Sequence, residues 1–237
     1  MNATAAVVTI GNELVSGDVP NTNGSWLAKR LAPLGVETRL LVAIPDELDV
    51  IAEMIRAEAV RHDFVLVTGG LGGTPDDITR EALAYTFGIP QVEYPELAAE
   101  LRHRFARNPD YAARWAQLPQ GSRPLDNPLG GAPGFTLENV YVFPGLPAEM
   151  EAMFLAIEEE FRRGSPIGAW RRMFRLGESA LAPALVEVGE RWPEVLVGSY
   201  PTFSAEGPRV EVVLKSSDAD ELASAAAWFE SALEERG

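Results

Sequence analysis

The most constraining feature of this sequence is the segment at 68–77, which reads Thr-Gly-Gly-Leu-Gly-Gly-Thr-Pro-Asp-Asp. It follows an apolar run at 64–67, which predicts a buried parallel strand. It precedes an amphipathic stretch at 78–87, which predicts a helix. Glycines and carboxylates therefore share a strand-to-helix turn, where α/β proteins bind ligands. Because glycine accepts positive φ and lets a ligand approach the main-chain amides, we expect a ligand-binding loop here.

The rest of the pattern predicts an α/β domain at 1–163 and a smaller α+β domain at 169–237. Strands of the first domain are predicted at 5–10, 36–44, 64–68 and 140–143. Helices are predicted at 25–34, 47–61, 78–87 and 148–162. This alternation favours a three-layer fold whose mostly parallel sheet has helices on both faces. We expect a mostly helical insertion at 90–123, a Gly- and Pro-rich loop at 124–134, and an antiparallel β-α-β-β-α unit after a linker at 162–168.

Composition excludes several function classes. The sequence has no cysteine, so disulfides, thiolate zinc sites and thiol nucleophiles are excluded. His62 and His103 are expected on helix surfaces, which argues against a Ser-His-Asp hydrolase. The formal net charge of −15 opposes binding to nucleic acids and anionic lipids, and residues 169–237 carry 7 bases against 12 acids. Without a signal-peptide pattern or a membrane-spanning stretch, we expect a cytoplasmic protein.

The acidic end of the glycine loop leaves two interpretations open. Thr74 to Asp77 alone fits a helix start, with Thr74 as N-cap and Pro75 at the first helical position. The four preceding glycines exceed what a cap requires, and the loop lacks the lysine of a phosphate-binding loop. Carboxylates beside a phosphate repel it unless a divalent cation lies between them. Asp76 and Asp77 therefore predict either a Mg²⁺-type ion bridging to a pyrophosphate, or acids that bind the N–H and O–H groups of a pterin or ribose.

Other acidic residues follow the neighbouring strands. Glu13 comes after the first strand, Asp46 after the second, and the segment 144–147 after the last. Right-handed crossovers place these strand ends at one edge of the sheet. Asp46 alone is compatible with an ordinary helix N-cap, and Glu13 alone is equally ambiguous. Together with the glycine loop, they predict an acidic ligand site.

Several motifs resemble a known family. They are Ile-Gly-Asn-Glu-Leu at 10–14, Asn-Thr-Asn at 21–23, and the segments 68–82, 127–135 and 144–150. They resemble the molybdopterin-binding domain shared by the MoaB and MogA proteins of molybdenum cofactor biosynthesis. They resemble still more closely the amino-terminal domain of CinA, the competence/damage-inducible protein. Residues 169–237 resemble the second region of CinA through Gly-Glu-Ser at 177–179 and Gly-Ser-Tyr-Pro at 198–201. CinA proteins commonly continue into a domain that deamidates nicotinamide mononucleotide, an activity not expected of this sequence.

The resemblance implies a function. In MogA-like relatives, two aspartates needed for pterin chemistry correspond to Asp77 and Asp46. In CinA relatives, the domain is associated with metal-dependent cleavage of ADP-ribose to AMP and ribose 5-phosphate. We therefore expect a pyrophosphohydrolase of ADP-ribose or a related nucleotide that depends on Mg²⁺, Mn²⁺ or Co²⁺. The alternative is a non-hydrolytic protein of cofactor metabolism that binds molybdopterin or a nucleotide.

The expected site residues come from these motifs. Asp77, Asp46 and Glu13 are the predicted catalytic residues, and Asp76 and Asp77 the predicted metal ligands. The predicted ligand-binding residues are Gly11, Asn23, Thr68, Gly69, Gly70, Leu71, Gly72, Thr74, Asn127, Gly145 and Pro147. The resemblance also implies a homodimer. Two residues depart from the family pattern: Gly73 stands where proline is usual, and Trp115 stands where a glutamine is expected. The first changes the stiffness of the loop, and the second bears on the identity of the substrate.

Overall fold

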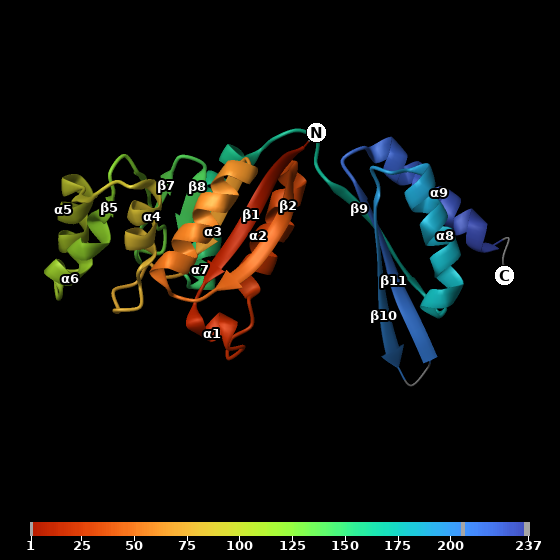
Figure 1. The fold of residues 1–237 in the computed structure, drawn as a ribbon, viewed down its shortest axis with the longest axis horizontal. Helices are drawn as coiled ribbons and strands as arrows, with labels where there is room; N and C mark the ends of the chain where they lie inside the picture. Colours follow the sequence, from red (N-terminus) through yellow and green to blue (C-terminus); the bar gives the residue numbers. More distant parts are fainter. Residues whose placement is uncertain (1, 205–206, 235–237) are drawn as a thin grey trace. The chain divides into compact units, whose positions relative to one another are not determined.

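The computed structural model describes residues 2–204 and 207–234 and divides into two compact units (Figure 1). The first unit comprises 3–31 and 36–163, and the second consists mainly of the residues from 164 onward. Each unit has a sheet and a hydrophobic core of its own.

The first unit is built on a six-stranded sheet with the strand order β2-β1-β3-β8-β7-β6. The strands are β1 (Ala3–Ile10), β2 (Val36–Ile44), β3 (Phe64–Thr68), β6 (Arg123–Leu125), β7 (Gly134–Leu137) and β8 (Val140–Phe143). The first three and β8 pair in parallel, whereas β7 and β6 add antiparallel pairs at one side. The mostly parallel sheet is therefore confirmed, while β6 and β7 were not predicted.

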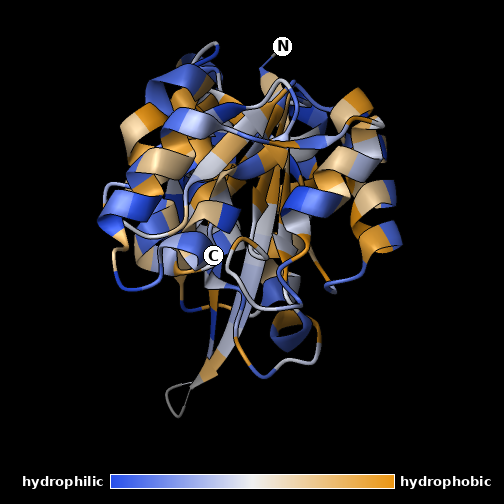
Figure 2. Ribbon diagram, turned by 90° about the vertical axis from the view of Figure 1, so that its left-hand side faces the viewer, coloured by the Kyte–Doolittle hydropathy of each residue, from blue (hydrophilic) through white to orange (hydrophobic). Residues whose placement is uncertain are grey.

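Helices cover both faces of this sheet. The helices of the first unit are α1 (Asn12–Val15), α2 (Thr22–Leu31), α3 (Leu48–Arg61), α4 (Thr79–Phe87), α5 (Pro95–Arg104), α6 (Pro109–Ala113) and α7 (Pro147–Ile157). Of these, α5 and α6 belong to the insertion at 90–123 and pack mainly on each other. Short 3₁₀ turns lie at Ala32–Leu34, Arg114–Ala116 and Glu158–Phe161. Alternate residues of β1, such as Val8 and Ile10, join Ile51 and Ile55 of α3 in one core cluster. On the other face, Phe154 of α7 contacts the rings of Trp26, Phe143 and Phe161. Figure 2 shows the hydrophobic residues along the central strands in orange.

The starts of α2 and α4 differ from the predicted starts for reasons that local contacts explain. Helix α2 starts at Thr22 rather than 25, because the Asn21 side chain accepts a hydrogen bond from the Gly24 N–H at 3.0 Å and caps the helix earlier. Helix α4 starts at Thr79, so the interpretation of Thr74 as its N-cap is wrong. Residues 74–77 form a turn of their own, in which the Asp77 N–H donates to the Thr74 carbonyl at 3.1 Å.

The insertion at 90–123 is only partly helical. Helices α5 and α6 occupy its middle, as predicted, but its ends form strands β4 (Gln91–Glu93) and β5 (Gln117–Pro119). These two strands pair antiparallel and close the insertion into a separate lobe. The mostly helical prediction therefore fails at the ends, where pairing between distant segments outweighs local preference.

The second unit has the predicted β-α-β-β-α order. Its elements are β9 (Gly168–Phe174), α8 (Glu178–Arg191), β10 (Leu196–Ser204), β11 (Gly207–Ser216) and α9 (Ala219–Glu234). The sheet order is β10-β11-β9 and both pairings are antiparallel. Leu181 of α8, Val212 of β11 and Phe229 of α9 are fully buried in one cluster. In the described part of the chain, no helix has the length and apolar character needed to cross a bilayer.

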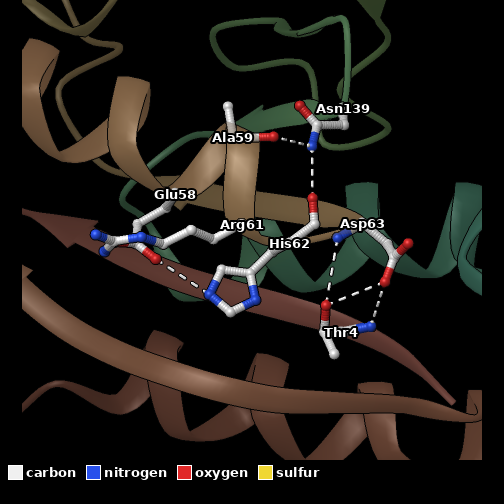
Figure 3. A network of polar contacts seen from close by, with 7 residues as sticks. All are labelled: Thr4, Glu58, Ala59, Arg61, His62, Asp63 and Asn139. Carbon is white, nitrogen blue, oxygen red and sulfur yellow. Dashed lines mark hydrogen bonds and ion pairs between the residues drawn. The ribbon is translucent and has the colours of Figure 1, made fainter. Parts of the chain in front are cut away.

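A network of polar contacts joins the amino-terminal ends of the strands (Figure 3). The Asn139 amide, just before β8, donates to the carbonyl oxygens of Ala59 at 2.9 Å and His62 at 2.8 Å. The Asp63 carboxylate, just before β3, accepts hydrogen bonds from the N–H and hydroxyl of Thr4 on β1. Three strands and the end of α3 are thereby fixed to one another.

His62 belongs to this network and does not lie on a helix surface. It follows α3, its side chain is 11% exposed, and its Nε2 lies 3.0 Å from Oε2 of the buried Glu58. The prediction for His62 is therefore wrong, because a buried carboxylate one helical turn earlier holds the ring inward. His103 is exposed on α5, as predicted.

Candidate functional site

A cavity of about 480 Å³ lies at the carboxyl ends of β1, β2, β3 and β8. This is the sheet edge at which the sequence predicts a site. The predicted residues that line the cavity are Gly11, Glu13, Asp46, Gly69, Gly70, Leu71, Gly72, Asp76, Asp77 and Gly145. The four predicted carboxylates, from three strand-end loops, therefore line one cavity.

The glycine loop packs closely against the end of β1 and the start of α4. Gly69 and Gly70 have φ values of 112° and 64°, which favour glycine. A Cβ at Gly69 would collide with the Ile10 carbonyl oxygen, and one at Gly70 would collide with the Thr79 hydroxyl. That hydroxyl donates to the Gly69 carbonyl at 2.9 Å. Glycine is thus required at both positions, and the loop backbone is exposed to the cavity.

Arg80 stabilises the glycine loop through hydrogen bonds to its backbone. Its guanidinium is buried and donates to the carbonyl oxygens of Leu71 at 2.8 Å and Gly72 at 2.7 Å. Burial lowers the pKa of Arg80 to about 10, and nearby Asp77 counteracts this effect. The sequence analysis did not predict that Arg80 stabilises the loop. An arginine on the buried face of a helix that follows a glycine loop would have indicated it.

Asp77 closes the loop on itself. Its Oδ1 accepts a hydrogen bond from the Gly72 N–H at 2.8 Å. Its Oδ2 accepts from the N–H of Thr74 at 2.8 Å and from the hydroxyl of Thr74 at 2.6 Å. Thr74 therefore acts on the ligand site through Asp77, since Thr74 does not line the cavity. A carboxylate has further lone pairs, so Asp77 keeps the capacity to face a ligand.

Asp46 lies opposite the start of α1. Its Oδ2 accepts a hydrogen bond from the Asn12 N–H at 2.8 Å, and its own N–H donates to the Asn12 side chain at 3.3 Å. Burial raises the pKa of Asp46, and the negative charges of Glu13, Asp76 and Asp77 raise it further. The Asn12 N–H opposes this rise. The acidic residues are therefore close enough to repel one another.

Asn23 and Thr68 fix the loop after β8. The Asn23 amide donates to the Thr68 hydroxyl at 3.1 Å and to the Gly145 carbonyl at 2.8 Å. The Thr68 hydroxyl donates to the Pro144 carbonyl at 2.7 Å. Asn23, Thr68, Gly145 and Pro147 line a smaller cavity of about 100 Å³, which also borders Glu13. These predicted ligand-binding residues thus support the site from its side.

Asn127 lies beneath the cavity and orients a carboxylate that the sequence analysis did not select. It is 2% exposed, and its amide donates to the Ala132 carbonyl at 3.0 Å and to Oε2 of Glu149 at 2.9 Å. Glu149 lines the cavity, in the first turn of α7. The same rule that selected Glu13 and Asp46, an acid just after a strand end, would also have found Glu149.

The side chains that line the cavity match the ligands of a hard cation such as Mg²⁺ only in part. Within residues 2–204 and 207–234, no three His, Cys, Asp or Glu side chains are grouped as a metal site would require. All charged side chains that line the cavity are carboxylates, and these are ligands that Mg²⁺ accepts. Mg²⁺ is commonly bound by one or two carboxylates together with substrate phosphates and waters. The residues therefore fit an ion that binds together with an anionic ligand.

Comparisons with known proteins agree with this fold. Residues 6–163 match a family described as a probable molybdopterin binding domain, and residues 173–237 match one described as the middle domain of FAD synthase. The chain therefore belongs to the molybdopterin-binding-domain family. Within it, the chain is a CinA-type member with a smaller second domain.

Individual relatives support this placement. A protein from Archaeoglobus fulgidus is 35% identical over 232 residues, which are 97% of this chain and 98% of that protein. A CinA-like protein from Frankia casuarinae is 38% identical over 206 residues, which are 79% of this chain and 48% of that protein. The crystal structure of CinA from Thermoplasma acidophilum, described there as of unknown function, matches with a TM-score of 0.64 and 31% identity. That match covers 68% of this chain and 98% of the other.

Proposed function

We propose that this protein is a divalent-metal-dependent pyrophosphohydrolase that cleaves ADP-ribose or a related nucleotide to AMP and a sugar phosphate. The observation that carries the proposal is the convergence of Glu13, Asp46, Asp76 and Asp77 on a cavity lined by glycine backbone. An acidic cavity repels a pyrophosphate by itself, whereas a divalent cation between the two makes binding favourable. The resemblance to CinA relatives supports the same reaction.

Each of these carboxylates has a role in the proposed reaction. A bound divalent ion would neutralise the phosphate oxygens and make a coordinated water more acidic. Asp76 and Asp77 of the glycine loop would hold such an ion, and Asp77 also accepts hydrogen bonds that close the loop. Asp46, whose pKa is raised, is suited to take the proton of the attacking water. The water oxygen bonds to phosphorus, the P–O bond to the bridging oxygen breaks, and the other phosphate leaves. Glu13, which lines the same cavity, would orient the water.

A second candidate function is binding of molybdopterin or a nucleotide without hydrolysis. Two observations favour it. Both oxygens of Asp77 already accept hydrogen bonds within the loop. The description of the matched family, a probable molybdopterin binding domain, names binding alone. In this case the carboxylates would accept hydrogen bonds from ligand N–H and O–H groups.

Product analysis separates the two candidates. Purified protein is incubated with ADP-ribose and Mg²⁺, Mn²⁺ or Co²⁺, and AMP and ribose 5-phosphate are quantified by chromatography. We expect release with at least one ion, loss of release after chelation, and a fall in kcat of about 100-fold or more for Asp46→Asn. The matched control is Asp49→Asn, because Asp49 is exposed on α3 and does not line the cavity. No release from ADP-ribose or other nucleoside diphosphate sugars, with molybdopterin binding in calorimetry, would favour the second candidate.

A further inference from the structure

An aromatic cluster of the insertion lies directly on the glycine loop. The Trp115 indole N–H donates to the Gly72 carbonyl at 3.1 Å. The ring centroids of Trp115 and Phe105 are 5.1 Å apart and perpendicular, and those of Trp115 and Tyr111 are 5.8 Å apart. The Tyr111 ring in turn covers Gly73, where a Cβ would collide with it. The indole is therefore held in one orientation relative to the predicted ligand-binding loop.

Trp115 also separates two cavities of opposite character. It lines the acidic cavity of about 480 Å³. It also lines a neighbouring cavity of about 520 Å³ whose wall includes Phe105, Tyr111, Arg104 and Arg107. The residues described for this second wall include no carboxylate. One side of Trp115 thus suits a cation and the anion bound to it. The other offers aromatic rings and the Arg107 guanidinium, whereas the Arg104 guanidinium is paired with Glu100 and lies 3.7 Å from Asp126.

This arrangement matches the two ends of a nucleotide. The pyrophosphate belongs with a cation on the acidic side. The base is planar and uncharged, and such rings stack on aromatic side chains and on arginine planes. A glutamine at position 115, the residue that the family resemblance leads us to expect, offers hydrogen bonds but no stacking surface. Trp115 therefore adds a contact that a glutamine at the same position would not make.

We propose that Trp115 is a specificity-determining residue that stacks on the heterocyclic base of the ligand at the junction of the two cavities. The inference rests on the proposed function in one respect only: that the ligand is a nucleotide. The stacking role does not require turnover, because stacking needs only binding of the ligand.

The experiment measures binding of AMP and of ribose 5-phosphate to the full chain in the presence of Mg²⁺, without added ADP-ribose. The variants are Trp115→Gln, which removes the stacking surface, and Trp115→Phe, which keeps a ring but loses the N–H donated to Gly72. The control is Trp26→Phe, because Trp26 lies in the same domain, packs on Phe154, and lines neither cavity. Calorimetry gives Kd, and tryptophan emission reports stacking on the indole directly.

We expect Trp115→Gln to weaken AMP binding by about 5- to 150-fold, the range for one base stacked on an aromatic ring, and to leave ribose 5-phosphate within about twofold. Trp115→Phe should retain most of the affinity for AMP. AMP should quench the emission of the wild type and of Trp26→Phe, and this quenching should disappear in Trp115→Phe.

Equal weakening of both ligands by Trp115→Gln would overturn the inference, because it would mean that the residue only shapes the loop. Unchanged AMP binding in Trp115→Gln, or no AMP binding by the wild type, would overturn it as well. The proposed function fails separately. AMP binding that depends on Trp115, together with no cleavage of ADP-ribose by any ion, would contradict hydrolysis and support the stacking role.

Discussion

Arg80 allows a quantitative prediction about the glycine loop. Its buried guanidinium donates to the carbonyl oxygens of Leu71 and Gly72. The lowering of its pKa to about 10 means that burial costs the charged form about 3 kcal/mol. Two hydrogen bonds from a charged donor contribute about 1.5–3 kcal/mol each, so they roughly offset that cost.

We therefore expect Arg80→Met to destabilise the protein by only about 1–3 kcal/mol. The lost hydrogen bonds and the relieved burial of charge nearly cancel, and the remaining cost is that of the Leu71 carbonyl left without this donor. The Gly72 carbonyl keeps the hydrogen bond from Trp115. Arg80→Lys should destabilise at least as much as Arg80→Met, because a buried ammonium retains the desolvation cost and lacks the fork that contacts two carbonyls at once.

Hydrogen exchange read by mass spectrometry is the suitable assay, because a chain with two units need not unfold in one step. Peptides that contain residues 69–74 should lose protection in both variants. The control is Arg56→Met. Arg56 is exposed on α3, and its hydrogen bond to the Thr86 carbonyl is long, at 3.5 Å. Full protection of the loop in Arg80→Lys would refute the reasoning, because it would show that charge alone suffices.

Two further predictions concern stability. The pKa of Asp46 is raised above 3.8 in the folded state, so the native protein binds this proton more tightly than the unfolded chain does. The free energy of unfolding therefore falls as the pH rises through the range just above 3.8. Asp46→Asn should remove this fall and raise the unfolding free energy at neutral pH only slightly, because solvent screens a partly exposed carboxylate. Thermal melts from the acid range to neutral pH measure this change; a loss of stability at neutral pH would contradict the reasoning. Gly69→Ala should cost at least about 2 kcal/mol more than Gly121→Ala, because both residues have positive φ but only at Gly69 would the Cβ meet backbone. Equal losses in urea titrations would argue against a steric role of the Ile10 carbonyl.

The parallel core of the fold was predictable because it depends on local patterns. Strand β3 has the bounds that its apolar run indicates, since a strand buried on both faces reads as a continuous apolar segment. Strand β2 also has the predicted bounds, although it lies at the edge of the sheet and is only partly buried. Strands β6 and β7 were not predictable in this way. Each is short, and each is adjacent to a loop rich in proline and glycine. Only their pairing with each other and with β8 makes them strands.

The site was predictable at the level of topology. Glu13, Asp46 and the glycine loop meet because successive crossovers of one hand bring strand ends to one edge. The hydrogen-bond partners of each carboxylate were not predictable. The contacts between Thr74 and Asp77 are local, but they close a turn before α4 and do not cap the helix. The contact by which Asn127 orients Glu149 joins distant segments and leaves no periodic pattern in the sequence.

The polar network around Asn139 and the candidate site lie at opposite ends of the strands. Strands β1, β3 and β8 are anchored at their starting ends by Thr4, Asp63 and Asn139, whereas the loops at their finishing ends line the candidate site. The residues that hold the strands together and the residues that line this site are therefore separate sets. A substitution at a lining position such as Trp115 leaves the contacts of the anchored end unchanged.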